Sequence, residues 1–186
     1  MLITISGMIG SGKGTVATLL GKRLGLPVYS IGDIRRTMAR QGGLTLEEYN
    51  RYGETHPSTD REPDQWAKQK ARQTGRGIFE GRVMFHFIPQ SVKIFLDCNE
   101  QESARRISRD RHAKRKNEAD LTETASALAA IRRRIKSDNK RYRKYYHLNV
   151  FDLRHYDLVI DTTRLTPHAA LNKILKYLAN YKNRRR

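Results

Sequence analysis

A short apolar strand segment that runs directly into a glycine-rich loop constrains the fold of this chain more than any other feature. Residues 2–5 (LITI) are apolar or β-branched, which is typical of a strand buried in a parallel sheet. The loop GMIGSGKGT follows at residues 7–15, and helically spaced apolar residues come after it. Glycines let backbone N–H groups point inward, and the helix that opens here adds partial positive charge. The segment therefore predicts a phosphate-binding loop between a strand and a helix.

The lysine of this loop indicates which ligand the loop binds. A plain glycine-rich turn would explain the glycines but not Lys13, which we expect to reach the β- and γ-phosphates of ATP. Gly14 stands where a serine or threonine usually ligates Mg²⁺, and Thr15 comes one position later. We therefore expect Mg²⁺ to be held mostly through water, with Thr15 as one candidate ligand. The residues predicted to bind ATP are Gly7, Met8, Ile9, Gly10, Ser11, Gly12, Lys13, Gly14 and Thr15.

The order of the remaining apolar segments predicts the fold class. Further strands are expected at residues 27–30, 77–80, 92–96 and 157–161, and helical segments separate them. This alternation predicts a three-layer α/β/α P-loop NTPase fold with a five-stranded parallel sheet. A chain of 186 residues without a Pro/Ser-rich linker fits a single domain, residues 1–186.

Positive charge is concentrated in two predicted helices. The chain has 37 Lys+Arg against 19 Asp+Glu, a formal net charge of +18, which points to polyanionic partners such as phosphates. Residues 105–116 and 132–144 hold seven and eight of these cations. They fall on helices expected at residues 99–116 and 125–146, so the sequence predicts a basic helical region.

Three negative observations bear on where the protein acts. No apolar run approaches the roughly 18 residues of a membrane span, and the N-terminus lacks the pattern of a signal peptide. Cys98 has no second cysteine with which to form a disulfide, which suits a reducing compartment. We expect a cytoplasmic monomer with no membrane partner.

Charged residues follow the second and third predicted strands. Glu80 and Arg82 end the third strand, and ligands collect at the carboxyl ends of parallel strands. Asp33 and Arg36 lie at the start of the helix after the second strand. Plainer interpretations remain open: Asp33 and Glu80 can act as helix caps, and Arg36 can lie on a solvated helix face.

The chain resembles the archaeal-type cytidylate kinases of the P-loop nucleoside monophosphate kinase family across nearly its whole length. The resemblance is carried by the segments ITISGMIGSGKGT, SIGDIRRTMARQGGLTLEEY, GIFEGR, RRRIKSDNKRYRKYY and YDLVIDTTRLTP. It implies transfer of the γ-phosphate of ATP to CMP or dCMP, with Mg²⁺ as cofactor. It also implies a core at about residues 1–32, 76–104 and 148–186, an NMP-binding helical region at about 33–75 and a basic lid at about 105–147.

The resemblance assigns roles to individual residues. Catalytic contacts to phosphate are implied for Lys13, Arg106, Arg134 and Arg141. Contacts to the acceptor nucleotide are implied for Arg36, Asp60 and Arg82. Asp138 would either orient an arginine or contact the acceptor nucleoside. Glu80 stands where relatives carry an acidic residue near Mg²⁺, which makes it a second candidate ligand. For a single lid arginine the alternative is a solvated basic helix, and for Asp60 it is a helix cap.

Two other functions compete with this interpretation. The net charge and the basic tail 184–186 also suit an RNA-associated P-loop NTPase such as a ribosome-assembly factor, or weak non-specific RNA binding. A kinase for UMP, AMP or a shikimate-like acceptor is the other alternative. A phosphate acceptor is already ionised at neutral pH and needs no catalytic base, whereas a hydroxyl acceptor needs a carboxylate such as Asp33.

Overall fold

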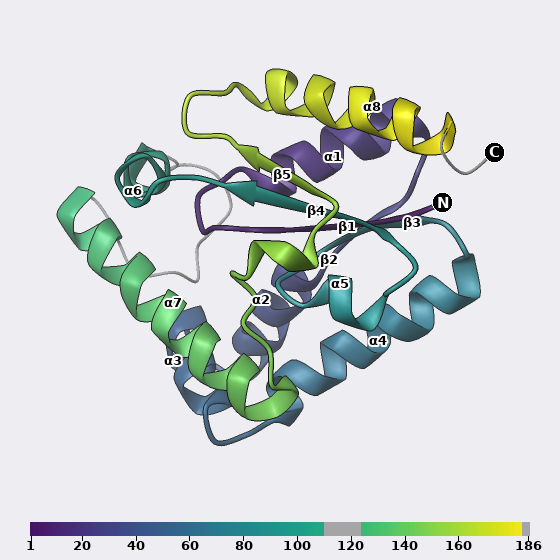
Figure 1. Ribbon diagram of the computed structural model, residues 1–186. Coiled ribbons are helices and arrows are strands. Elements are labelled where there is room, and N and C mark those ends of the chain that lie inside the picture. The colour runs from purple at the N-terminus through teal and green to yellow at the C-terminus, as the bar shows by residue number, and fades with distance from the viewer. Residues whose placement is uncertain (110–123, 184–186) are drawn as a thin grey trace.

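Five parallel strands form the central sheet of the computed structural model, which describes residues 1–109 and 124–183 (Figure 1). The strands are β1 (Leu2–Gly7), β2 (Val28–Ser30), β3 (Gly77–Glu80), β4 (Val92–Asp97) and β5 (Leu158–Asp161). They lie side by side in the order β2-β3-β1-β4-β5, so β1 is central. Because all five run in the same direction, their carboxyl ends meet at one edge of the sheet.

Helices cover both faces of the sheet, which confirms the predicted three-layer fold. Helices α1 (Lys13–Leu24) and α8 (Pro167–Asn183) lie together on one face. Helices α4 (Ser58–Thr74) and the short α5 (Met84–Phe87) lie on the other face (Figure 1). The remaining helices gather around the carboxyl edge and the second face: α2 (Ile31–Gln41), α3 (Leu46–Gly53), α6 (Glu100–Arg109) and α7 (Thr124–Tyr146).

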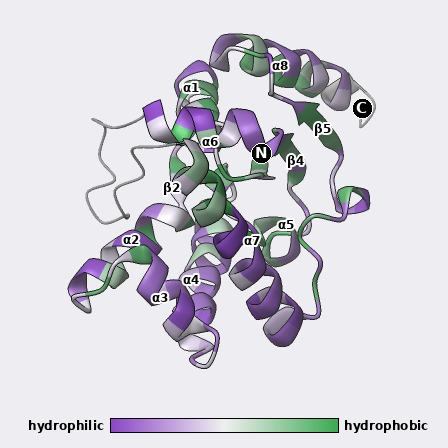
Figure 2. Cartoon of the chain, turned by 90° about the vertical axis from the view of Figure 1, so that its left-hand side faces the viewer, coloured by the Kyte–Doolittle hydropathy of each residue, from purple (hydrophilic) through white to green (hydrophobic). Residues whose placement is uncertain are grey.

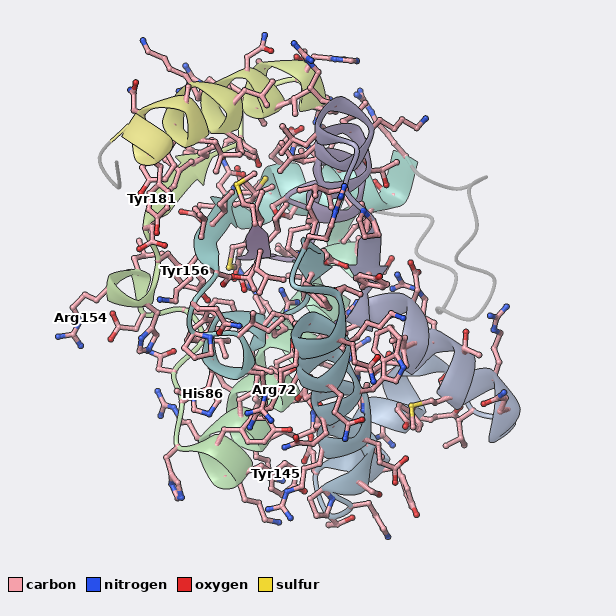
Figure 3. All side chains as sticks on the ribbon, turned by 90° about the vertical axis from the view of Figure 1, so that its right-hand side faces the viewer. Arg72, His86, Tyr145, Arg154, Tyr156 and Tyr181 are labelled. Carbon is pink, nitrogen blue, oxygen red and sulfur yellow. The ribbon has the colours of Figure 1, made fainter. Side chains whose placement is uncertain are left out.

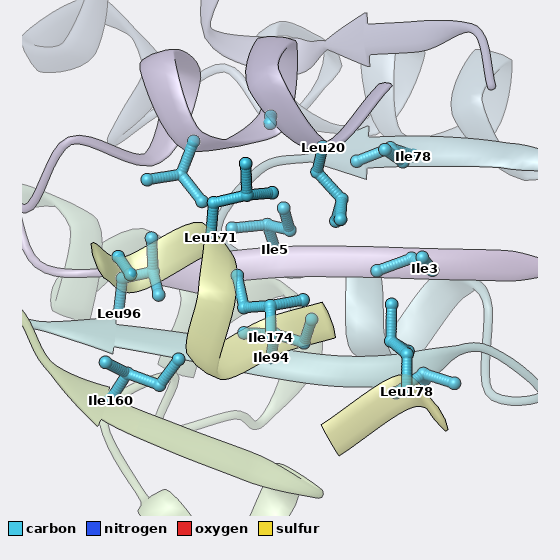
Figure 4. Packing of buried hydrophobic residues seen from close by; sticks show 14 residues of the cluster. Ile3, Ile5, Leu20, Ile78, Ile94, Leu96, Ile160, Leu171, Ile174 and Leu178 are labelled. Carbon is cyan, nitrogen blue, oxygen red and sulfur yellow. The ribbon is translucent and has the colours of Figure 1, made fainter. Parts of the chain in front are cut away.

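Two clusters of buried side chains hold these layers together. The first lies between the sheet and the helices α1 and α8, where aliphatic side chains interdigitate (Figure 4). Its members include Ile3, Ile5, Leu20, Ile78, Ile94, Leu96, Ile160, Leu171, Ile174 and Leu178. The second lies on the opposite face and is more aromatic, with Phe79, Phe85 and Tyr142 among its members. Burial on both faces of β1, β3 and β4 explains why these strands read as continuous apolar runs.

The outer surfaces are hydrophilic, as the composition requires. Hydrophilic residues predominate along α3 and α7 (Figure 2). Arg154 extends outward from a 3-10 turn at Leu153–His155, where its guanidinium pairs with Asp152 (Figure 3). Within residues 1–109 and 124–183, none of the helices combines the length and apolar character needed to span a bilayer.

The residues that cap the helices show that three interpretations made from the sequence are wrong. The N-caps of α2, α4 and α5 are Ser30, Pro57 and Val83. The cap roles considered for Asp33, Asp60 and Glu80 are therefore wrong. The basic helix expected at residues 99–116 is described as α6 up to Arg109, and its remainder lies outside the described residues, as does the tail 184–186.

Candidate active site

The predicted phosphate loop joins β1 to α1 at the carboxyl edge of the sheet. Gly12 is the N-cap of α1 and has a φ of 83°, a left-handed conformation that glycine adopts without strain. At Gly7 a side chain is excluded because an added Cβ would lie 2.1 Å from the carbonyl oxygen of Leu96 in β4. These two positions explain why the loop needs glycine at both its start and its end.

Hydrogen bonds from side chains hold the phosphate loop in place. The Nζ of Lys13 donates to the carbonyl of Met8 at 2.7 Å, and the Ser11 hydroxyl donates to the same oxygen at 2.8 Å. Thr162, just after β5, donates to the carbonyls of Ser11 at 3.1 Å and Asp97 at 2.7 Å. The loop is thus fixed to the ends of β4 and β5 before any ligand binds.

One cleft of about 820 Å³ extends from this loop to the helices α2, α4, α6 and α7. A volume of this size lies in the upper part of the range for ligand sites, which is about 300–1,000 Å³. The sequence-predicted residues that line it are Ile9, Gly10, Ser11, Gly12, Lys13, Gly14, Thr15, Arg36, Glu80, Arg82, Arg106, Arg134 and Asp138. Gly7, Met8, Asp60 and Arg141 do not line it.

Arg82 connects α7 to the phosphate loop. Its Nε donates to the carboxylate of Asp138 on α7 at 2.8 Å, and its Nη1 donates to the carbonyl of Gly7. Burial opposes ionisation of Asp138, but the guanidinium groups around it prevail and lower its pKa to about 2. Asp138 is therefore a permanent anion that orients Arg82 at the cleft wall.

Arg141 and Asp60 lie beneath the cleft wall instead of facing a ligand. The Arg141 side chain is 0% exposed, and it donates to Asp60 on α4 and to Asp138 on its own helix. Asp60 also accepts from Arg35 at 2.6 Å. Direct contacts of Arg141 with phosphate and of Asp60 with the acceptor nucleotide are therefore not available in this arrangement.

Arg106 and Arg36 reach the cleft from opposite sides. Arg106 on α6 pairs with Glu102 at 2.8 Å and donates to the carbonyl of Thr162 at 2.7 Å, close to the anchored phosphate loop. Arg36 on α2 pairs with Asp33 at 2.7 Å, and the Asp33 carboxylate is 73% exposed. Both arginines line the cleft, together with Arg134 from α7.

Glu80 and Thr15, the two residues predicted to lie near a metal ion, both line the cleft. Glu80 is buried at the end of β3, lines the cleft and accepts a hydrogen bond from the Ser30 hydroxyl at 2.8 Å. In the described part of the chain, no cluster of three or more acidic, histidine or cysteine ligands exists. Mg²⁺ commonly takes one or two carboxylates, several waters and substrate phosphates, so one carboxylate beside a phosphate loop fits this ion.

Sequence reasoning missed four buried polar residues that line the inner wall of the cleft. They are Arg35, Asn50, Asp64 and Tyr142. Asp64 follows Asp60 by one helical turn, so the spacing of the two carboxylates was a usable signal. Burial raises the pKa of Asp64 to about 7, against a hydrogen bond from Tyr146 that favours the anion.

The parallel sheet, the phosphate loop at its carboxyl edge and the surrounding arginines define a P-loop kinase fold. Solved structures share this fold: shikimate kinase from Aquifex aeolicus has a TM-score of 0.58 at 17% identity, covering 98% of both chains. An uncharacterized protein from Eubacterium ventriosum has a TM-score of 0.68 at 17% identity, covering 96% of this chain and 98% of its own. At such identities the likeness concerns the fold alone.

The chain belongs to the cytidylate kinase-like family, whose model matches residues 2–164. The cytidylate kinase of Methanothrix thermoacetophila is 37% identical over 172 residues, which cover 92% of this chain and 94% of that protein. The cytidylate kinase of Methanothermobacter thermautotrophicus is 36% identical over 170 residues, covering 91% and 100%. These matches confirm the family resemblance inferred from the sequence segments.

Proposed function

We propose that this protein is a (d)CMP kinase that transfers the γ-phosphoryl group of ATP to CMP or dCMP. The observation that carries the proposal is a single cleft whose wall contains both a phosphate loop and arginines from four other segments. Family membership supports the choice of a cytidine monophosphate as the acceptor.

The phosphate loop forms the donor half of the site. Its backbone N–H groups and the N-terminus of α1 favour the negative charge of a bound triphosphate. Lys13 would exchange its hydrogen bond to Met8 for phosphate oxygens, since both are acceptors within reach of the same amine. Mg²⁺, when bound, would neutralise charge on the donor phosphates, held by water with Glu80 and Thr15 nearby.

The arginines around the cleft form the acceptor half of the site. Arg36 and Arg82 would grip the phosphate of the monophosphate, because the planar guanidinium binds two oxygens at once. Arg106 and Arg134 would stabilise the negative charge on the γ-phosphoryl group during its transfer. An oxygen of the acceptor phosphate attacks the γ-phosphorus, the bond to ADP breaks, and no catalytic base is required because that phosphate is already ionised.

The family relationship favours this function over the alternatives considered from the sequence. RNA binding is supported by the net charge of +18 and by the basic residues 184–186. Exposed cations of α7 pair with carboxylates of other helices, Arg132 with Glu100 and Arg133 with Glu47. A shikimate-like acceptor has support only from fold similarity at low identity.

Turnover measurements with ATP and a panel of acceptors test the proposal. We expect phosphorylation of CMP and dCMP to exceed that of UMP, AMP and shikimate. Lys13→Met should lower kcat by about a hundredfold or more, since a cation at the migrating charge is lost. Lys22→Met, on the exposed side of the same helix, is the matched control and should retain activity. If no nucleoside monophosphate is phosphorylated, the proposal is wrong.

A further inference from the structure

The inner wall of the cleft is built from buried polar side chains that no phosphate role explains. Arg35, Asn50 and Asp64 come from three helices, α2, α3 and α4, and each is at most 7% exposed while lining the cleft. Ile31 and Tyr142 line the same region and supply apolar and aromatic surface. Buried hydrogen-bonding groups beside an aromatic surface are suited to a flat heterocycle.

The two aspartates of α4, Asp60 and Asp64, have different environments, and only Asp64 can accept a hydrogen bond from a ligand in the cleft. The Asp60 oxygens are occupied by Arg35 and Arg141, and Asp60 does not line the cleft. The Oδ2 of Asp64 accepts from the Tyr146 hydroxyl at 2.8 Å. Within residues 1–109 and 124–183 its Oδ1 accepts no hydrogen bond. Asp64 therefore offers an acceptor to whatever enters the inner cleft.

Cytosine and uracil differ in the hydrogen-bonding group that such an acceptor would meet. Cytosine carries an amino donor at position 4, where uracil carries a carbonyl acceptor. We propose that Asp64 selects cytosine over uracil in the acceptor nucleotide by accepting a hydrogen bond from the 4-amino group. This inference rests on the proposed kinase function and adds the residue that sets the preference for the base.

The charge state of Asp64 decides how strongly it discriminates. The titratable groups that act on it are Arg35 on α2, Asp60 on its own helix, and Arg141 and Tyr146 on α7. Desolvation outweighs the two arginines and raises the pKa of Asp64 to about 7. Above this pH the anion accepts from cytosine and repels the carbonyl of uracil. Below it the neutral acid can donate to that carbonyl, so discrimination weakens.

The decisive measurement is the ratio of kcat/KM for CMP to that for UMP. Asp64→Asn keeps the shape and the acceptor for Tyr146 but adds an amide donor, so this ratio should fall about ten- to hundredfold. The same change at Asp152, which pairs with Arg154 on the surface, is the matched control and should leave the ratio unchanged. An unchanged ratio in active Asp64→Asn would overturn the inference.

The pH profile of the same ratio gives a readout that a structural role would not move. Because kcat/KM reports the free enzyme, the wild-type ratio should fall about tenfold from pH 8.5 to pH 5.5. Both substrates share the phosphate ionisation near pH 6, so that ionisation cancels in the ratio. Tyr146→Phe removes a hydrogen bond that favours the anion and should move the midpoint to higher pH. A flat profile that Tyr146→Phe does not shift contradicts the inference.

Failure of the inference is distinguishable from failure of the proposed function. If wild-type protein phosphorylates neither CMP, dCMP nor UMP, the kinase proposal itself is wrong. If wild-type protein is active and its preference for CMP persists in Asp64→Asn, the kinase proposal stands and the role of Asp64 is rejected.

Discussion

At the scale of single residues, the charges buried behind the cleft have a different role from the charges that face it. Arg141 lies between Asp60 and Asp138, and Asp138 in turn holds Arg82 at the phosphate loop. A buried ion network is not necessarily stabilising compared with an apolar core, but removing one member leaves a charge without compensation. Arg141 therefore acts on the site by positioning other groups.

Arg141→Met measures what this buried network contributes to stability. The change leaves Asp60 and Asp138 short of a buried partner, so the free energy of unfolding should fall by about 3–5 kcal/mol. Arg143→Met, an exposed position on the same helix, should change it by less than about 0.5 kcal/mol. Urea unfolding of both variants gives the comparison. Equal stability of the two variants would show that the Arg141 network contributes nothing beyond a surface charge.

At the scale of elements, the start of α2 links helix stability to the site. The Ser30 hydroxyl caps α2 by accepting from the N–H of Asp33 at 3.2 Å, and it donates to Glu80 at 2.8 Å. The start of α3 is also capped by a hydroxyl group, in a capping box formed by Thr45 and Glu48. Neither of these two residues lines the cleft. Ser30 and Thr45 therefore allow the loss of a helix cap beside the cleft to be compared with the loss of a cap away from it.

Ser30→Ala and Thr45→Ala should have similar effects on stability and different effects on activity. Each variant loses one N-cap, which costs about 1 kcal/mol of unfolding free energy. Under the proposed function only Ser30→Ala should raise the KM for CMP, because α2 carries Arg36 and because Glu80 loses its partner. Thermal unfolding and steady-state kinetics measure the two effects. A rise in KM of the same size in Thr45→Ala would refute the local explanation.

The fold was predictable from the sequence because its elements depend on local patterns. Strands buried on both faces must be continuous apolar runs, and each of the five occurs within two residues of its expected bounds. The phosphate loop was predictable because its glycines meet backbone constraints at fixed positions, as at Gly7 and Gly12. The four-residue helix α5 was missed, since it is shorter than two turns and shows no periodicity.

The interior of the site was less predictable because it depends on contacts between distant segments. Asp60 and Arg141 are 81 residues apart, and each looks like a solvated charge in its own helix. Their mutual burial follows from the packing of α4 against α7, which no local pattern encodes. The same packing makes Asp64 the aspartate of α4 that lines the cleft, where the sequence had led us to expect Asp60.

At the scale of the whole molecule, a net charge of +18 opposes the compact state through mutual repulsion. Exposed ion pairs between α3 and α7 act in the opposite direction. Arg133 pairs with Glu47 at 2.9 Å, and Lys140 pairs with Glu54 across an opening of about 460 Å³ between these helices. Added salt screens both effects, so its net influence depends on which one is larger.

Salt titration of a double variant separates the two contributions. Wild-type stability should rise from about 20 mM to 300 mM NaCl, because repulsion among the 18 excess charges is screened first.

Glu47→Gln with Glu54→Gln removes both pairs and should cost at most about 1 kcal/mol per pair at low salt. This deficit should narrow in 1 M NaCl, where the Debye length is about 3 Å. The deficit of Arg141→Met should persist there, because its carboxylates are shielded from ions by burial. Urea unfolding at the three salt concentrations measures the stability of the wild type, the double variant and Arg141→Met. If the stability that the double variant loses does not change with salt, the α3–α7 pairs have no electrostatic role.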